Sequence, residues 1–248
     1  CVGEYVKAGD TVLDLGCGRG GDLAKFHHAK IAKWVGVDVA SNSVHDAESR
    51  FRGSSRRHDF AFEAEFHVAD FTRSGDIPRG TFDVISCQMA MHYAFGSESS
   101  ARSFFAAVAD RLKPGGFLLT TVPDPEVIVR RVRAGACQNE LYSIRSGSMD
   151  SIRDTFGVAY EFFLVESVEA CVEYLVCGVE ALCSEFGMRV VKDQNFSAMN
   201  PCKCMSRSES EVATLYKVLV LAKLPLGWFS RLTGRLCPEC RPQAAGKS

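Results

Sequence analysis

The feature that most constrains the fold is a glycine-rich turn that directly follows a short apolar run near the start of the chain. The run spans residues 11–15, and the turn reads Gly16-Cys-Gly18-Arg-Gly20-Gly21. The run has the length and β-branched content of a buried strand, and glycine lets the backbone approach a ligand closely. We therefore predict an open α/β sheet with a ligand-binding loop after its first strand.

Further short apolar runs, each closed by a polar residue or a proline, predict the other strands of this sheet. Stretches with helical periodicity lie between them, and the alternation predicts a parallel sheet with helices on both faces. The predicted strands are 11–15, 34–37, 66–69, 82–87 and 117–122, and the predicted helices are 22–29, 43–51 and 99–112.

The second half of the chain has a different texture, with longer patterned segments and a loop rich in serine and cysteine. The predicted elements are a strand at 159–165, one long amphipathic helix at 167–186 that stops at Gly187, a loop at 197–210, and strands at 188–191 and 212–222. We expect one domain over residues 1–223, followed by a tail at 224–248 that docks loosely or not at all.

Net charge and hydropathy limit the partners of the chain. The formal net charge is −1, which is not that of a general polyanion binder. Positive charge is nevertheless concentrated in two arginine clusters, which fit either solvated faces or local steering of a phosphate-bearing substrate. No apolar run reaches the length of about 18 residues that spans a bilayer, and we expect no membrane partner. The clusters are Arg50, Arg52, Arg56 and Arg57, and Arg130, Arg131 and Arg133.

The 11 cysteines do not form the short, dense framework of small disulfide-bonded domains. Cys17, Cys87 and Cys171 lie inside apolar segments and behave there as small apolar residues, which fits a reducing compartment. One CxxC pair and one CxC pair fall short of the two CxxC pairs that indicate zinc, and we expect no metal. The pairs are Cys237 with Cys240, and Cys202 with Cys204.

Polar residues at the ends of the predicted strands mark the ligand site, because open parallel sheets bind ligands at the carboxyl ends of their strands. Gly16, Gly18 and Gly21 satisfy the dinucleotide-binding fingerprint. Asp38 closes the second strand, where a carboxylate accepts hydrogen bonds from a ribose diol. Asp70 closes the third strand, where a carboxylate could accept from the amine of adenine. Asp38 and the glycines also fit a redox enzyme that uses NAD.

Four motifs taken together favour a different class. The series resembles the class I S-adenosylmethionine-dependent methyltransferases over about residues 11–122, although each motif alone is weak. The motifs are Asp14-Leu-Gly-Cys-Gly18, Val-Ala-Asp70, Phe82-Asp-Val-Ile-Ser-Cys-Gln88 and Leu112-Lys-Pro-Gly-Gly-Phe117.

A narrower resemblance links the chain to the enzymes that methylate N7 of the guanine cap on messenger RNA, and it extends to about Lys223. It implies a Rossmann-like class I methyltransferase fold, α/β, with a mostly parallel seven-stranded sheet and helices on both faces. The matching segments are Val12-Leu-Asp-Leu-Gly-Cys-Gly-Arg-Gly-Gly-Asp-Leu23, Phe62-Glu-Ala-Glu-Phe-His-Val-Ala-Asp70 and Ser86-Cys-Gln-Met-Ala-Met-His-Tyr-Ala-Phe95, together with Pro123, the segment of Glu173 and residues 211–220.

The resemblance also implies the ligands and the residues that contact them. The cofactor would be S-adenosylmethionine, with S-adenosylhomocysteine as its product, and the substrate would be the capped 5′ end of RNA (GpppN). The positions that match donor-binding residues are Gly16, Asp22, Asp38, Asp70, Gln88 and Tyr93. Those that match the surroundings of the cap guanine are His92, Tyr93, Pro123, Glu173 and Tyr216. Those that match contacts to the cap phosphates and sugar are Arg19, Lys25 and Arg50.

Elementary chemistry fits these assignments. Guanine N7 is an unprotonated lone pair at neutral pH, so we expect no general base and no catalytic residue beyond alignment and fixed charge. Glu173 suits the N1–H and N2 edge of guanine, His92 or Tyr93 suits O6, and Tyr216 suits base stacking. Taken singly, each has a structural interpretation: Glu173 would be a solvent-facing charge on a helix, and the other three would be packing residues.

Three departures from the family pattern stand out. The family has an Asn-Asn-Trp-Ile-Lys-like helix before the first strand, and this sequence begins too late to contain it. Arg19 stands where lysine is common in the family. The cysteine-containing tail has no counterpart in the family. Because the chain begins at Cys1, we expect it to be the carboxyl-terminal part of a larger nuclear capping polypeptide that is fused to or associated with a guanylyltransferase. The alternatives are another class I methyltransferase acting on a small molecule or other nucleic acid, an NAD-dependent redox enzyme, and a non-catalytic subunit that binds RNA or a protein.

Overall fold

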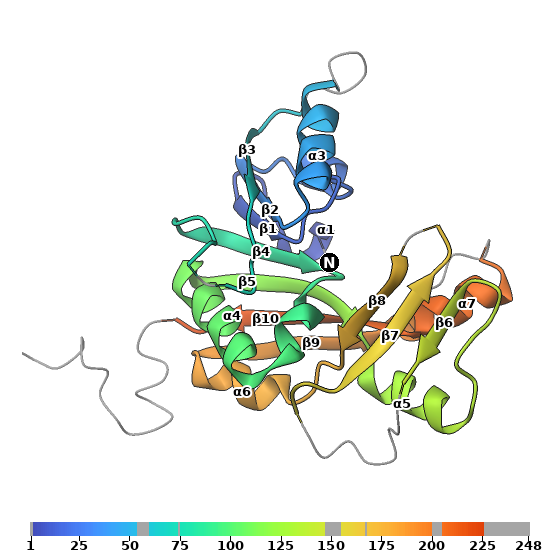
Figure 1. The fold of residues 1–248 in the computed structure, drawn as a ribbon. Coiled ribbons are helices and arrows are strands. Elements are labelled where there is room, and N and C mark those ends of the chain that lie inside the picture. The colour runs from blue at the N-terminus through green and yellow to red at the C-terminus, as the bar shows by residue number, and fades with distance from the viewer. Residues whose placement is uncertain are drawn as a thin grey trace, which may run out of the picture.

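The fold combines one large sheet, helices on both of its faces and a small second sheet at one end (Figure 1). It was obtained as a computed structural model, which describes residues 2–53, 60–73, 75–146, 155–166, 168–199 and 205–225. Arg56, Arg57, the four cysteines at positions 202, 204, 237 and 240, and residues 226–248 lie outside the described residues.

The large sheet has seven strands in the order β3-β2-β1-β4-β5-β10-β9. Neighbours from β3 to β5 are parallel, whereas β10 is antiparallel to both β5 and β9, which confirms the predicted mostly parallel sheet. The strands are β1 (Thr11–Leu15), β2 (Lys33–Asp38), β3 (Glu63–Val68), β4 (Phe82–Gln88), β5 (Leu112–Pro123), β9 (Met188–Asn195) and β10 (Tyr216–Lys223).

Apolar cores on both faces explain why the central strands read as continuous apolar runs rather than as alternating ones. Four of the five residues of β1 are buried, and so are four of the six residues of β2. Helices α1 (Val2–Tyr5), α2 (Leu23–His28) and α3 (Ser41–Gly53) pack on one core, and η2 (Met91–Gly96), α4 (Glu98–Arg111) and α6 (Val179–Glu185) pack on the other. The three helices predicted in the first half are therefore confirmed.

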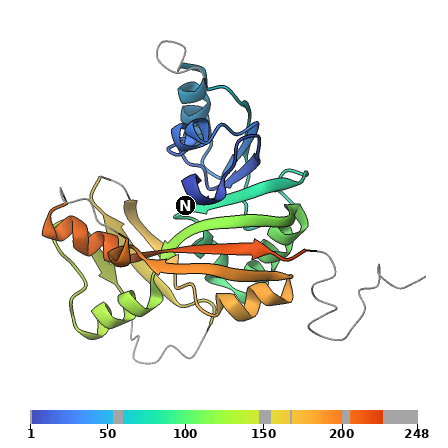
Figure 2. The same ribbon diagram turned by 180° about the vertical axis from the view of Figure 1, so that it is seen from behind.

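A three-stranded antiparallel sheet, in the order β6-β7-β8, lies beside one end of the large sheet in both views (Figures 1 and 2). The neighbouring helices, α5 and α7, share its core. Asp124 caps α5, because its side chain accepts hydrogen bonds from the backbone amides of Glu126 and Val127. The elements are β6 (Tyr142–Arg145), β7 (Ala159–Leu164), β8 (Val168–Tyr174), α5 (Pro125–Arg133), η3 (Phe196–Ala198) and α7 (Arg207–Thr214).

The long helix predicted over residues 167–186 is wrong. Its first half is strand β8, which pairs with β7, and only its second half is helical, as α6. Gly178 separates the two halves with φ +66°, a conformation that interrupts a helix. Pairing with another strand therefore overrides the apparent helical period, and Glu173 is a buried residue of a strand rather than a solvent-facing charge on a helix.

The strand predicted over residues 212–222 is correct only in its second part. Residues up to Thr214 belong to α7, and β10 begins at Tyr216. The helix begins at a capping box in which the Ser206 side chain and the Glu209 side chain each bond the other residue's backbone amide. The loop predicted over 197–210 is interrupted by η3 and by the start of α7, whereas the strands predicted at 159–165 and 188–191 are confirmed.

Candidate functional site

The ends of four parallel strands bring together a group of residues that we call the strand-end cluster: Gly16, Asp22, Asp38, Asp70 and Gln88. Gly16 follows β1, Asp38 ends β2, Asp70 follows β3, and Gln88 ends β4. Because these strands are parallel neighbours, their carboxyl ends share one edge of the sheet. The fifth member, Asp22, precedes α2 as its N-cap residue.

Backbone geometry explains the glycine at position 16. Its φ is +73°, and its amide donates a hydrogen bond of 2.8 Å to the carbonyl of Val37, which joins the loop to β2. A Cβ at this position would lie 2.5 Å from the Cβ of Ala90. Gly18 also has a positive φ, +50°, but no described atom lies within 4 Å of the place its Cβ would take. The loop is thus closed on the inner side and open above Gly18.

Both aspartates at the strand ends already accept backbone hydrogen bonds. The Asp38 carboxylate accepts from the amide of Gly18 at 2.8 Å and from the amide of Ala40 at 2.9 Å. The Asp70 carboxylate accepts from the amide and the hydroxyl of Thr72 at 3.0 Å and 2.6 Å. A carboxylate offers about four lone-pair directions, so each aspartate keeps acceptor capacity for a ligand hydroxyl or amine.

The side chain of Gln88 lines a cavity of about 830 Å³ together with Asp22 and Lys25. Its amide group donates to the carbonyl of Leu119 at 2.9 Å, and its amide oxygen accepts from the hydroxyl of Thr121 at 2.7 Å. Asp22 pairs with Lys25 at 2.6 Å. The cavity, which we call the front cavity, therefore holds a fixed amide beside a carboxylate–ammonium pair.

A buried acid lies behind the strand-end cluster. The Asp14 side chain is on β1 and accepts a hydrogen bond of 3.3 Å from the indole of Trp34. Burial raises the pKa of Asp14 to about 7, and the negative charge of Asp22 adds to the rise. Asp14 is thus a buried acid of β1 that is held by the indole of Trp34.

A second group, which we call the carboxylate cluster, consists of His92, Tyr93, Pro123, Glu173 and Tyr216. The structure brings these five residues together from four distant segments: η2, the end of β5, β8 and the start of β10. Pro123 and Tyr216 are paired across β5 and β10. The rings of His92 and Tyr93 lie 4.2 Å apart.

Glu173 is the charged centre of this cluster, and its side chain is almost fully buried. One carboxylate oxygen accepts a hydrogen bond of 2.6 Å from the hydroxyl of Tyr160. The other oxygen lies 3.6 Å from Nε2 of His92. Burial raises the pKa of Glu173, and the hydrogen bond from Tyr160 opposes that rise.

His92 is neutral in this environment and lacks partners. Burial lowers its pKa to about 3, and 1% of the residue is exposed. Within the described residues, neither of its ring nitrogens has a hydrogen-bond partner. A buried polar group without a partner is costly, and such groups occur where a ligand satisfies them.

The two tyrosines of the cluster differ in access to solvent. Tyr93 is 39% exposed, and its hydroxyl lies 3.7 Å from the sulfur of Cys171. Tyr216 is buried, and its ring meets that of Phe162 edge to face at 6.2 Å. Burial and the nearby Glu173 charge raise the pKa of Tyr216. A flat ligand that reached the carboxylate would therefore meet an accessible aromatic ring and buried polar groups.

The three cations predicted to face phosphates lie on or beside the glycine loop and the helices that flank it. Arg19 is exposed and pairs with Asp46 at 3.4 Å. Lys25 pairs with Asp22 in the front cavity. Arg50 donates to the carbonyl of Gly20 at 3.3 Å. Arg19 and Lys25 are thus exposed cations with different partners, whereas Arg50 contacts the backbone of the loop.

Three residues that sequence reasoning did not single out belong to this region. Val39 is 69% exposed directly after Asp38, and Met89 is 40% exposed directly after Gln88, although both are apolar. Met89 also has φ +54°, which is unusual for a residue other than glycine. Val39 and Met89 directly follow polar residues that were predicted to bind the ligand, and this position in the sequence could have identified them as candidates. Tyr160 was hidden because its partner strand was predicted to be a helix.

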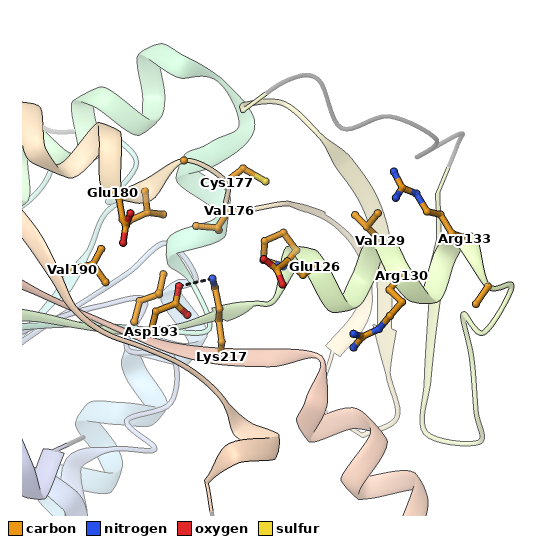
Figure 3. Close-up of a pocket in the computed structure, with 15 residues that line it drawn as sticks. Glu126, Val129, Arg130, Arg133, Val176, Cys177, Glu180, Val190, Asp193 and Lys217 are labelled. Atoms are coloured by element: carbon orange, nitrogen blue, oxygen red, sulfur yellow. Dashed lines mark hydrogen bonds and ion pairs between the residues drawn. The ribbon is translucent and has the colours of Figure 1, made fainter.

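A second cavity, with a volume of about 920 Å³, lies elsewhere (Figure 3). Lys217 and Leu219 of β10 line it, whereas Val218 lines the front cavity, so the two cavities lie on opposite faces of this strand. Arg130 and Arg133 of α5 flank this rear cavity, and Lys217 pairs with Asp193 at 2.9 Å on its floor. Two of the three arginines of α5 therefore lie at the rear cavity, whereas Arg131 bonds Tyr142 and Thr214.

The strand order, the single reversed strand and the loop after β1 define the class I S-adenosylmethionine-dependent methyltransferase fold. The chain is similar to a solved S-adenosylmethionine-dependent methyltransferase from Clostridium acetobutylicum, with a TM-score of 0.58, 16% identity and coverage of 90% of this chain and 87% of that chain. A methyltransferase from Methanosarcina mazei gives a TM-score of 0.59 and 15% identity over 90% of this chain and 97% of that chain. These structures establish the fold.

Within that class, the chain belongs to the mRNA (guanine-N(7))-methyltransferase domain family, which matches residues 1–204. It is 36% identical over 212 residues to mRNA cap guanine-N(7) methyltransferase 1 of Oryza sativa subsp. japonica, covering 77% of this chain and 56% of that protein. It is 35% identical over 216 residues to the mRNA cap guanine-N(7) methyltransferase of Drosophila melanogaster, covering 79% and 50%. The chain thus spans about half the length of these curated relatives. The family and the fold imply S-adenosylmethionine as the methyl donor.

Proposed function

We propose that this chain transfers a methyl group from S-adenosylmethionine to N7 of the guanine cap of messenger RNA. The observation that carries the proposal is the carboxylate cluster. It joins a buried carboxylate, a neutral histidine whose ring nitrogens have no hydrogen-bond partner in the described part of the chain, and an accessible tyrosine, beside the ligand edge of a methyltransferase sheet. Donor binding alone does not require such a group, whereas recognition of guanine does.

The residues of the strand-end cluster fit the donor. The backbone above Gly18 is open, so a ligand can lie against it, and Asp38 keeps acceptor capacity for the ribose hydroxyls. Asp70, which keeps acceptor capacity, would accept from the adenine amine, and exposed Val39 would offer an apolar surface to the base. Gly16, Asp22, Gln88 and Tyr93 complete the proposed set. When bound, S-adenosylmethionine supplies a methyl group on a positively charged sulfur.

The carboxylate cluster fits guanine by its pattern of donors and acceptors. Glu173 offers two acceptor oxygens to N1–H and N2–H₂, which adenine does not present. Neutral His92 keeps one N–H, which can donate to O6. Tyr93 offers an exposed ring for contact with the base, and Pro123 and Tyr216 complete the surroundings. Arg19, Lys25 and Arg50 would face the phosphates and sugar of the cap.

The chemistry requires the chain to orient rather than to transfer protons. Guanine N7 carries a free lone pair, so no side chain has to remove a proton. The residues of both clusters would align N7 with the methyl group, which removes much of the entropic cost before reaction. Residues 1–223 would form the catalytic domain, followed by a tail at 224–248. The proposed setting is the nucleus, in a polypeptide fused to or associated with a guanylyltransferase.

The experiment is methyl transfer from labelled S-adenosylmethionine to RNA with an unmethylated guanosine cap, followed by digestion and identification of the methylated nucleotide. We expect N7-methylguanosine from capped RNA. RNA with a 5′ triphosphate and RNA with an adenosine cap are the controls, and we expect no cap-linked product from either. Equal methylation of all three RNAs, or a methyl group at another position, would contradict the proposal and favour another class I methyltransferase. Binding of NAD in place of the donor would favour a redox enzyme.

A further inference from the structure

We propose that Tyr160 is a positioning residue that sets the orientation and the charge of the Glu173 carboxylate, and thereby the selection of guanine through its N2 amine. The inference rests on the proposed function, because it concerns how the carboxylate cluster reads the base. It starts from a contact that the sequence did not indicate.

The contact between the two residues is built into the small sheet. Tyr160 on β7 and Glu173 on β8 are opposite each other in the antiparallel register, so their side chains lie on the same face. The Tyr160 hydroxyl donates to Oε2 of Glu173 at 2.6 Å, a short bond of the charge-assisted kind. Both residues are at most 4% exposed. The bond is therefore shielded from water, which would otherwise weaken it.

The position of this hydroxyl gives the two carboxylate oxygens different surroundings. Oε2 is held by Tyr160, while Oε1 faces Nε2 of His92 across 3.6 Å, beyond hydrogen-bonding distance. A carboxylate that is held at one oxygen can still accept from two parallel N–H groups, because each oxygen has two lone pairs. Without the tyrosine hydroxyl, the carboxylate would rotate about its last bond, and two donors on a flat base would no longer both be met.

Among the described neighbours of Glu173, Tyr160 is the one whose hydrogen bond favours the negative charge of the carboxylate. His92 from η2 is neutral, and Tyr93 from the same helix, Tyr216 from β10 and Cys171 from β8 are uncharged neighbours. Burial raises the pKa of Glu173, and the hydrogen bond from Tyr160 lowers it. The hydroxyl therefore keeps the buried acid ionised at a lower pH than the pocket would otherwise allow.

The test compares wild type with Tyr160→Phe, which removes only the hydroxyl. It uses RNA with a guanosine cap and RNA with an inosine cap, which lacks the N2 amine. We expect kcat/KM for the guanosine cap to fall roughly 10- to 100-fold, the range of one charge-assisted hydrogen bond. The value of kcat/KM for the inosine cap should fall less, so the ratio of the guanosine value to the inosine value should become smaller. The acid limb of the pH profile of kcat/KM should move to higher pH, because Glu173 becomes harder to ionise.

The matched control is Tyr142→Phe. Tyr142 is a buried tyrosine of the same small sheet, on β6, and its hydroxyl bonds Arg131 and the carbonyl of Ala136. Its loss should lower stability but leave both the cap preference and the acid limb in place. A second control is Tyr160→Phe made together with Glu173→Gln. Because Tyr160 acts through Glu173, the added loss in that background should be much smaller than in wild type.

Two results would overturn the inference. One is an equal loss for guanosine and inosine caps with an unmoved acid limb, which would make the hydroxyl a folding contact only. The other is a full additional loss of activity from Tyr160→Phe in the Glu173→Gln background. Failure of the proposed function would look different, because wild type would bind S-adenosylmethionine and methylate neither cap. Donor affinity of each variant, measured without RNA, shows that the fold is retained.

Discussion

The strand-end cluster and the carboxylate cluster face neighbouring parts of the same edge but are built from different kinds of contact. Four of the five members of the first lie at the ends of consecutive strands, and backbone amides or carbonyls already hold Asp38 and Gln88. Members of the second come from four distant segments, and among the described residues Tyr160 supplies the hydrogen bond that holds their carboxylate. In that cluster, His92 is buried without a partner among the described residues.

The difference indicates how each cluster should respond to change. Backbone hydrogen bonds tie the strand-end cluster to the sheet. A substitution in this cluster should therefore lower both the stability of the fold and the affinity for the donor. The carboxylate cluster is costly to the free protein, because buried polar groups without partners destabilise it. A substitution in the carboxylate cluster should therefore weaken the use of the capped substrate and leave the stability of the fold nearly unchanged. The predictions below test this contrast, beginning with the largest expected effect.

Glu173→Gln should separate the clusters most clearly. The substitution keeps the size of the side chain but places an amide donor against the N–H groups of guanine. We expect a loss of about 2–4 kcal/mol in transition-state stabilisation, calculated from kcat/KM for capped RNA. Affinity for S-adenosylmethionine, measured by calorimetry without RNA, should stay close to that of wild type. A parallel fall of both quantities would mean that the clusters are not separable.

Gly16→Ala should act on the fold. The φ of +73° is strained for alanine, and the new Cβ would lie 2.5 Å from that of Ala90. Strain and overpacking together should lower the free energy of unfolding by about 2–3 kcal/mol, as measured by urea denaturation. Gly21→Ala is the matched control, because no described atom lies within 4 Å of its Cβ position. Equal stability of the two variants would show that the loop adapts.

Asp38→Ala should weaken donor affinity by about 1–3 kcal/mol, since a ribose hydroxyl would lose its acceptor. The amides of Gly18 and Ala40 would also lose their partner, so a lower melting temperature should accompany the loss. Asp38→Asn keeps one acceptor oxygen, so its donor affinity should lie between that of wild type and that of Asp38→Ala. Calorimetry with S-adenosylmethionine measures the affinity. A variant that binds the donor as tightly as wild type would remove Asp38 from the site.

Asp14→Asn should change how stability depends on pH. The folded-state pKa of Asp14, about 7, is above the unfolded value of about 3.9, so its contribution is fully favourable below pH 4 and is lost as pH rises through 7. For one proton the slope is at most about 1.4 kcal/mol per pH unit. The variant should therefore lose less stability between pH 5 and pH 8 in urea titrations. Identical slopes would mean that Asp14 ionises normally.

Gly16, Asp38 and Asp70 could be named from the sequence because each lies within two residues of a predicted strand end, whereas Asp22 and Gln88 were assigned to the donor through the family resemblance. Asp38 and Asp70 follow short apolar runs, and parallel strands carry such positions to one edge. The positions of Val39 and Met89 were equally available, but exposure of an apolar residue becomes visible only in the fold.

The residues of the carboxylate cluster were named only through the family resemblance. The predicted helix over 167–186 placed Glu173 at the surface, and the structure buries it on β8. Its burial depends on pairing with β7, a contact between separate segments that local periodicity does not encode. Tyr160 could not be identified for the same reason, because its role depends on Glu173 of the paired strand β8.

Strands β6, β7 and β8 follow one another along the chain and form a sheet of their own, beside a seven-stranded sheet shared with methyltransferases of about 15% identity. The proposed guanine-reading carboxylate and its supporting tyrosine both belong to that stretch. A change of acceptor would therefore have to act through both sheets, because Glu173 and Tyr160 lie on the small sheet whereas Pro123 and Tyr216 lie on β5 and β10 of the large one.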